Sequence, residues 1–143
     1  QISACVGAGF QALALDETRN TYRPEIWEES PDWPVLVQQV WFVGNHGDVG
    51  GQLSGFASAR PLSNIPLVWM LKQAESCGLL LPAGWQGRYP QDPGAPSVGT
   101  FSGYGRVFIT RRARTVGIDP SERVHPSLAH APKHLSWRMR FSK

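Results

Sequence analysis

The sequence predicts an α/β protein with a mostly parallel β-sheet, on the strength of one buried strand and one amphipathic helix. Residues 35–43, Val-Leu-Val-Gln-Gln-Val-Trp-Phe-Val, are rich in β-branched and aromatic side chains and lie between Pro34 and Gly44, which is typical of a strand. The second half of this run, residues 40–43, is apolar without polar alternation. A strand of that kind is covered on both faces, as in a parallel sheet flanked by helices.

The helix is expected from about residue 64 to residue 77. Ser63 or Asn64 is the predicted cap, Pro66 fits the first turn, and Gly78 follows the end. A broad apolar stripe predicts that this helix covers one face of the sheet.

The other segments give weaker signals. Val6, Phe10 and Leu13 recur at helical spacing in an Ala- and Leu-rich run, which favours an amphipathic helix, with a strand as the alternative. Residues 82–105 are dense in Gly and Pro and predict a loop. Residues 104–116 are interpreted as an exposed strand pair.

Length and composition predict a single domain, or a large piece of one, because 143 residues with 41% hydrophobic content are enough for one core. The charge is uneven. Residues 106–143 hold nine Lys and Arg against two acids, whereas residues 1–105 hold five against nine. A basic C-terminal segment of this kind can meet nucleic acid, a phospholipid surface or water, and a solvated face is the commonest case.

Targeting and redox signals are absent from the sequence. The chain starts at Gln1 without a basic region or cleavage site, so we expect no signal peptide in it and an origin in a longer chain. The longest apolar stretches, 35–43 and 65–71, are far shorter than the roughly 20 residues of a membrane-spanning helix. Cys5 and Cys77 form no metal or disulfide pattern, and we expect two buried free thiols.

The candidate chemistry lies where the predicted strand ends, in residues 44–51, Gly-Asn-His-Gly-Asp-Val-Gly-Gly. Reacting groups gather at this edge of parallel sheets. His46 suits acid–base catalysis because its unperturbed pKa is near neutrality, and glycines let the chain turn and a substrate approach. Asp48, Gly50 and Gly51 are the candidates for shaping the site, with Asp48 bonded to nearby backbone. The alternative is a Gly-rich connection without catalytic function.

A metal site would need further ligands beside His46. The other histidines are His125, His130 and His134. The last two share helical spacing, but Pro132 lies between them and would break the helix. We therefore predict no metal and no cofactor.

Four segments occur in one order along the chain, and a fifth follows them. They are ALALDETR at 12–19, YRPEIW at 22–27, QVWFVGNHGDVGG at 39–51, LSNIPLVWML at 62–71 and ERVHPS at 122–127. Together they resemble the catalytic domain of type VI secretion phospholipase effectors, which are α/β-hydrolases. The resemblance covers most of the chain, with residues 80–115 the least diagnostic.

The resemblance implies a three-layer α/β-hydrolase fold, of which residues 1–143 would be the C-terminal portion. It also implies a serine-type hydrolase acting on ester bonds, with phospholipids as the substrates of characterised effectors. His46 matches the histidine that takes the proton from the serine and returns it to the leaving group. In this fold the serine and the acid precede the histidine. The sequence contains no Gly-x-Ser-x-Gly. Ser54 and Ser102 are each followed by glycine but lack the glycine two places before the serine. We expect the nucleophile and the acid upstream, with Asp16 as the fallback acid and this chain alone inactive.

The resemblance further implies a phospholipid or other ester as substrate, peripheral membrane contact, no nucleic-acid partner, and a location in the bacterial cytoplasm or as a secreted effector. Arg111, Arg112 and Arg114 are candidates for contact with anionic head groups, although a solvated edge is the preferred interpretation. The alternative function is a non-catalytic fragment or a binding module whose basic tail contacts anionic surfaces.

Two groups of residues are predicted to be structural. Asp16, Glu17 and Arg19 are interpreted as a capped or salt-bridged helix end that shapes the site indirectly. The tryptophans are expected to pack in the core and loops. They are Trp27, Trp33, Trp41 and Trp69.

Overall fold

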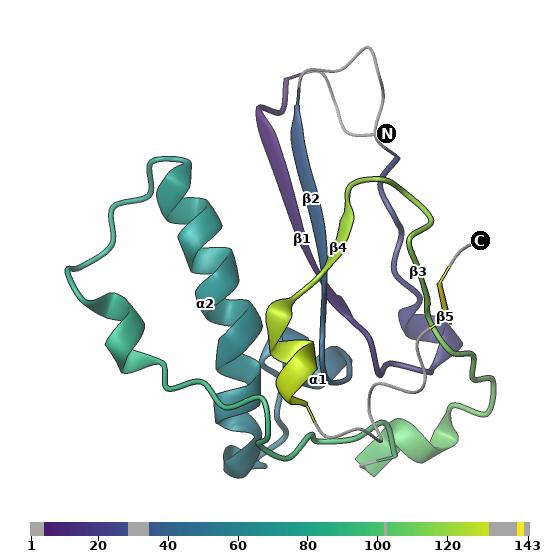
Figure 1. Ribbon diagram of the computed structural model, residues 1–143. Coiled ribbons are helices and arrows are strands. Elements are labelled where there is room, and N and C mark those ends of the chain that lie inside the picture. Colours follow the sequence, from purple (N-terminus) through teal and green to yellow (C-terminus); the bar gives the residue numbers. More distant parts are fainter. Residues whose placement is uncertain (1–4, 29–34, 102, 132–139, 142–143) are drawn as a thin grey trace.

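A computed structural model describes residues 5–28, 35–101, 103–131 and 140–141 (Figure 1). The predictions made for Trp33, Ser102 and His134 concern residues outside these ranges. The strands are β1 (Ala8–Ala14), β2 (Leu36–Phe42), β3 (Thr115–Val116), β4 (Glu122–Val124) and β5 (Arg140–Phe141), and the α-helices are α1 (His46–Gly50) and α2 (Arg60–Ser76). Short 3-10 helices lie at Asn20–Tyr22, Ala57–Ala59, Trp85–Arg88, Gly103–Val107 and Pro126–His130.

The main sheet has the strand order β1-β2-β4, and both of its strand pairs are parallel. β1 and β2 pair along their whole lengths, from Ala8 opposite Leu36 to Ala14 opposite Phe42. β3 and β5 form a second, two-stranded parallel pair. The predicted α/β fold with a mostly parallel sheet is confirmed.

The predicted helix around Val6 to Leu13 is wrong, because this segment forms β1. Its residues pair with β2 along seven positions, so a partner distant in sequence overrides the local preference of an Ala-rich run for helix. Leu13 is buried, and Ala12 packs against the opposite core cluster. A strand covered on both faces lacks the alternation that would have identified it.

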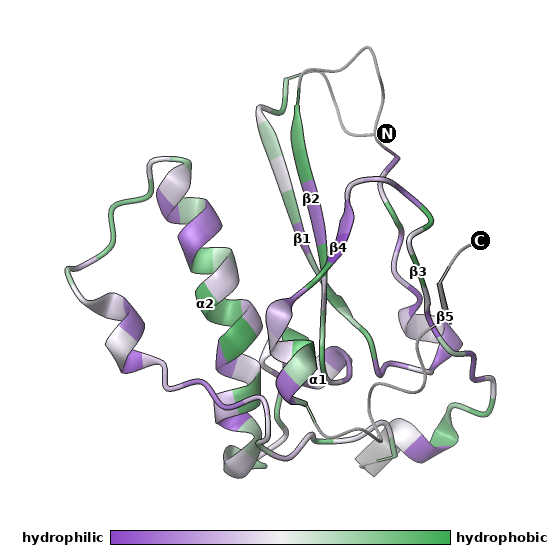
Figure 2. Cartoon of the chain, in the orientation of Figure 1, coloured by the Kyte–Doolittle hydropathy of each residue, from purple (hydrophilic) through white to green (hydrophobic). Residues whose placement is uncertain are grey.

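β2 confirms the predicted buried strand, and its side chains alternate between two core clusters. Val40 and Phe42 pack with residues of α2, whereas Trp41 packs with Leu13 and Val116 on the other face. Figure 2 shows a hydrophilic band in the middle of β2 between hydrophobic ends, and this band corresponds to the two glutamines in its sequence. The sheet is therefore buried on both faces at its carboxyl end.

Gln39 in this band is buried and bonds to the chain on both sides. Its side-chain amide exchanges hydrogen bonds with the backbone of Trp27 at 2.7 and 2.8 Å and donates to Ser121 Oγ at 2.8 Å.

Trp41 and Trp69 belong to or pack against the core, as predicted, and Trp27 is half-buried.

α2 covers one face of the sheet, as predicted, but it begins at Arg60, four residues before the expected start (Figure 1). Pro61 occupies the first turn, where a missing N–H costs nothing, and the helix continues through Pro66. Ser63 and Asn64 are therefore not caps but buried helix residues. The end is as predicted: the helix stops at Ser76, and the glycine after it has a left-handed backbone.

Residues 82–101, 103 and 104 form the predicted loop, with short 3-10 helices in it. The strand pair expected over residues 104–116 is wrong, since the described chain there has only β3 and an isolated bridge between Arg111 and Arg19. The two cysteines are exposed, so their expected burial is also wrong. Within the described ranges no helix is both long and apolar enough to cross a bilayer.

Candidate functional site

The turn after β2 is held by the end of the neighbouring strand. Asp16 follows β1, and its Oδ2 accepts a hydrogen bond from the backbone N–H of Gly44 at 2.8 Å. Gly44 has φ +107°, and a Cβ atom there would lie 2.6 Å from the Cβ of Asp48. The turn thus requires glycine, and Asp16 shapes it from β1.

Helix α1 starts directly after this turn with a reciprocal cap. Asn45 Oδ1 accepts from the N–H groups of Gly47 at 2.7 Å and Asp48 at 3.1 Å, while Asp48 Oδ2 accepts from the N–H of Asn45 at 2.8 Å. This is a capping box, with both side chains buried. The predicted local bond from Asp48 to backbone is confirmed.

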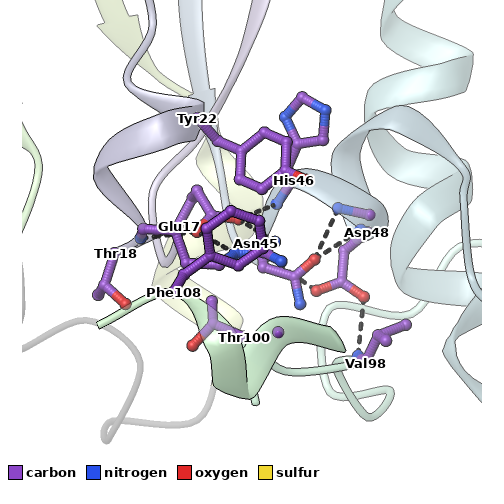
Figure 3. A network of polar contacts seen from close by, with 12 residues as sticks. Glu17, Thr18, Tyr22, Asn45, His46, Asp48, Val98, Thr100 and Phe108 are labelled. Carbon is purple, nitrogen blue, oxygen red and sulfur yellow. Dashed lines mark hydrogen bonds and ion pairs between the residues drawn. The ribbon is translucent and has the colours of Figure 1, made fainter. Parts of the chain in front are cut away.

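Asp48 also binds a segment fifty residues further along the chain. Its Oδ2 accepts from Ser97 Oγ at 2.5 Å. Its Oδ1 accepts from the N–H of Val98 at 2.9 Å (Figure 3). A serine in a loop gives no sign in the sequence that it will contact Asp48, because the two residues lie 49 positions apart. The carboxylate therefore joins α1 to the long loop.

His46 is the first residue of α1 and lies at the carboxyl end of β2. Its backbone N–H donates to Glu17 Oε2 at 3.1 Å, while its side chain is exposed. The imidazole stacks on the Tyr22 ring with the centroids 4.6 Å apart and the planes 28° apart (Figure 3). The backbone of His46 is thus fixed while its ring faces open space.

Glu17 is 1% exposed and forms an ion pair with Arg19. Arg19 Nε donates to Oε1 at 2.8 Å, and its Nη2 donates to Oε2 at 2.6 Å. Burial raises the pKa of Glu17, but the bonds from the Arg19 side chain and from the backbone of Arg19 and His46 outweigh it and hold the pKa below its ordinary 4.5. The predicted salt bridge is present, but it follows a strand and not a helix.

The Arg19 guanidinium also lies over aromatic rings. It is 4.4 Å from the centroid of Tyr22 and 5.6 Å from that of Phe108. Tyr22 therefore contacts the imidazole of His46 and also Arg19, and cation–π attraction holds the stack together. The contacts of Tyr22 and Phe108 were not predicted from the sequence. Tyr22 begins one of the segments that carry the family resemblance, but nothing in that segment indicates stacking on His46, and Phe108 belongs to no such segment.

A cavity of about 370 Å³ opens beside the imidazole. It lies between β1, the Asn20–Tyr22 turn and α1, and its lining includes His46, Tyr22 and Gly50. Gly50 ends α1, and Gly51 follows it with a left-handed backbone of φ +81°. The structure thus brings all five predicted site residues together at one strand edge: Asp16, His46, Asp48, Gly50 and Gly51.

The arginines expected on a solvated edge behave differently from one another. Arg112 is exposed, but Arg111 is half-buried and donates to the carbonyls of Thr100 and Gly105 at 3.2 and 2.6 Å. Arg114 is 5% exposed. The solvated interpretation is therefore wrong for two of the three, because backbone carbonyls of neighbouring loops take up their guanidinium groups.

Among the described residues no group of three or more His, Cys, Asp and Glu side chains is placed to hold a metal ion. His125 stacks on Phe42 with the centroids 4.7 Å apart, and its Nδ1 lies 2.8 Å from Ser127 Oγ. Burial, and to a lesser degree Lys72, lowers its pKa. It is a packed residue on the opposite side of β2 from Trp41.

The fold and the site together define an α/β protein that presents one exposed histidine at the carboxyl end of a parallel strand, beside a cavity. A family model described as the T6SS phospholipase effector Tle1-like catalytic domain matches residues 1–73, about half of the chain. The chain belongs to this family, and the membership supports a phospholipase-like hydrolase function with a lipid substrate. No curated protein and no solved structure was found to match the chain.

Proposed function

We propose that the protein is a serine-type ester hydrolase of the phospholipase or lipase kind, in which His46 is the general base and general acid. The observation that carries this proposal is the combination of a fixed backbone and an exposed ring at His46. The Glu17 bond and the capping box hold the main chain, and the ring borders the 370 Å³ cavity. Preorganisation of this kind is what positioned acid–base catalysis needs.

In the proposed reaction a serine Oγ attacks the ester carbonyl carbon while its proton passes to a ring nitrogen of His46. The tetrahedral intermediate collapses, the ester C–O bond breaks, and His46 returns the proton to the leaving alcohol oxygen. Water then attacks the resulting serine ester while His46 takes its proton. The bond to the serine Oγ breaks, His46 returns the proton to that oxygen, and the carboxylic acid is released. Stacking on Tyr22 would keep the imidazole oriented through both proton transfers.

The serine and the triad acid would come from parts of the complete protein that lie outside these 143 residues. No Gly-x-Ser-x-Gly occurs in the sequence. Asp16 is buried and its Oδ2 binds Gly44, which favours a role in shaping the turn over a role as the triad acid. Because the nucleophile motif is absent from residues 1–143, this part alone would bind or position a substrate without hydrolysing it.

The test is His46→Ala in the complete protein, assayed on phospholipid vesicles and on a soluble short-chain ester. Loss of a positioned general base should lower kcat/KM by about 10²- to 10⁴-fold on both substrates. His130→Ala is the matched control, because His130 is exposed and lies in the Pro126–His130 turn away from the cavity lining. Equal activities of the two variants, with both folded by circular dichroism, would refute the role of His46.

A separate observation tests the origin of the nucleophile. The coding sequence before residue 1 should encode a Gly-x-Ser-x-Gly motif, and Ser→Ala at that motif should abolish hydrolysis. An active complete protein without such a motif would exclude the serine mechanism.

A further inference from the structure

A second cavity, of about 480 Å³, lies outside the His46 site. Its walls come from two distant parts of the chain, the segment from Asn20 to Ile26 and the segment from Arg112 to Ile118, with Trp41 of β2 between them. Arg23 and Pro24 border both this cavity and the one beside His46. We call this second space the arginine cavity, after Arg23, Arg112 and Arg114.

Arg114 is the buried member of the set. It is 5% exposed, and its Nη2 donates to the carbonyl oxygens of Arg19 at 3.0 Å and Tyr22 at 2.8 Å. Its Nε is buried without any hydrogen-bond partner in the part of the chain that the structure describes. Within that same part, the ion pair that is present joins Arg19 to Glu17 and does not include Arg114. Arg114 is thus a buried cation without a directly bonded carboxylate.

The charges around the cavity are unbalanced. Arg23 and Arg112 are exposed and line it together with Arg114, and among the lining residues that the structure describes the acid is Glu25. Burial lowers the pKa of Arg114, Glu17 opposes this shift, and the nearby guanidinium groups of Arg23 and Arg19 add to it. An anion in the cavity would offset the repulsion among the guanidinium groups of Arg23, Arg112 and Arg114, because all three side chains line the same space.

The cavity also has an apolar side, formed by Ile26, Trp41 and Ile118. Its volume lies within the range of small-molecule sites and exceeds what an inorganic anion fills. Guanidinium groups match phosphate oxygens through paired hydrogen bonds. An organic phosphate, with its charge on the arginines and its carbon skeleton on the apolar side, satisfies both features.

We infer that the arginine cavity is a phosphate-binding site that takes a small organic phosphate or a phosphorylated head group, with Arg114 at its buried end and Arg23 and Arg112 at its exposed side. Part of its wall, from residues 112–118, lies beyond the residues that the family model matches. The inference does not depend on ester hydrolysis, because binding alone defines the site. Arg23 places it next to the His46 cavity.

The experiment titrates the protein with inorganic phosphate and with glycerol 3-phosphate, by calorimetry and by the side-chain Nε–H signals of arginine in ¹⁵N spectra, at constant chloride. The Arg114 signal, assigned by its loss in Arg114→Lys, should shift with both ligands. Arg112→Gln should raise the Kd of glycerol 3-phosphate about tenfold, the effect of losing one charge-assisted hydrogen bond. Arg88→Gln is the matched control, because Arg88 is exposed and lines neither cavity.

Vesicles separate the two sources of phosphate. Phosphatidylglycerol vesicles that bind the wild type and Arg88→Gln, but bind Arg112→Gln less tightly, identify the ligand as a lipid head group. Binding of glycerol 3-phosphate without such vesicle binding identifies a soluble phosphate. No shift of the Arg114 signal, or equal Kd values for the Arg112 and Arg88 variants with both folded by circular dichroism, would overturn the inference.

Discussion

Glu17 serves two neighbouring parts of the site with one carboxylate, because it neutralises Arg19 and accepts the backbone N–H of His46. Arg19 in turn lies over the Tyr22 ring that stacks on the imidazole. A buried anion of this kind holds its neighbours firmly only while it is charged. The orientation of His46 is therefore coupled to the ionisation of Glu17, which binds the backbone of His46.

Replacing Glu17 by Gln should destabilise the protein by about 3 kcal/mol near pH 7, because it removes the charge from a buried pair and leaves the Arg19 guanidinium without its anion. Urea unfolding measures the difference. Glu28→Gln is the control, since Glu28 is exposed, and should change stability by no more than about 0.5 kcal/mol.

The stability effect of Glu17→Gln should depend on pH. The folded-state pKa of Glu17 lies below the ordinary 4.5, so its contribution is complete above that pH and is lost as the pH falls through the folded value. The stability difference between the wild type and Glu17→Gln should therefore be largest at neutral pH and shrink in acid below 4.5. A difference that stays constant over this range would show that the charge is not responsible.

Tyr22 offers a test of ring stacking at His46. If His46 is the catalytic base, Tyr22→Ala should lower kcat/KM of the complete protein about tenfold, because the imidazole loses the surface that orients it. Tyr22→Phe keeps the ring and should stay within about twofold of the wild type. Equal losses in both variants would assign the effect to the hydroxyl group and not to stacking.

At the scale of elements, the turn between β2 and α1 links the sheet to the histidine. Asp16 holds Gly44 from the neighbouring strand, and Asn45 and Asp48 cap the helix that begins with His46. Each of these bonds uses a residue within a few positions of a strand end. Parallel pairing of β1 with β2 therefore suffices to bring Asp16 and Glu17 beside His46.

Gly44→Ala should destabilise the protein by about 3 kcal/mol or more, because its φ of +107° disfavours a side chain and the new Cβ would collide with Asp48. Gly50→Ala is the matched control in the same segment. Gly50 has open space around it and lies in α1, so alanine should be neutral or add about 0.5 to 1 kcal/mol. Denaturant unfolding of both variants checks the prediction, and a tolerated Gly44→Ala would contradict the geometry.

The sequence predicted the elements whose signals are local and missed those decided by distant partners. β2 and the end of α2 were predicted correctly, since β-branched residues and a terminal glycine mark them directly. β1 was predicted as a helix, because the spacing of its apolar residues suits either structure and pairing with β2 decides between them. The start of α2 was misplaced because Pro61 and Pro66 each fit a first turn.

The candidate site follows the same rule. His46 and Asp48 were found because they follow the buried strand in a Gly-rich turn, and the capping box confirms the local role of Asp48. The contacts of Asp48 with Ser97 and of Arg114 with the 19–22 segment join residues about 50 and 90 positions apart. No periodicity or spacing in one sequence encodes such contacts.

At the scale of the whole molecule, residues beyond the family match complete the core. Val116 packs with Trp41 and Leu13, and Ala95 with Val40 and Phe42. Glu122 in β4 accepts from Trp41 Nε1 at 2.7 Å, and also from two backbone N–H groups of the turn before it. β4 covers the edge of β2 that would otherwise be open.

A chain cut after residue 73, where the family match ends, should therefore fail to form a stable core. It would expose Trp41 and Phe42, leave the indole N–H without Glu122, and open one edge of β2 to pairing with other chains. We expect strong binding of a hydrophobic dye, association in solution and no cooperative urea transition, in contrast to the 143-residue chain. A cooperative transition of residues 1–73 with native-like strand signal would show that the matched half folds by itself. It would also make residues 74–143 an addition to the fold and not a part of its core.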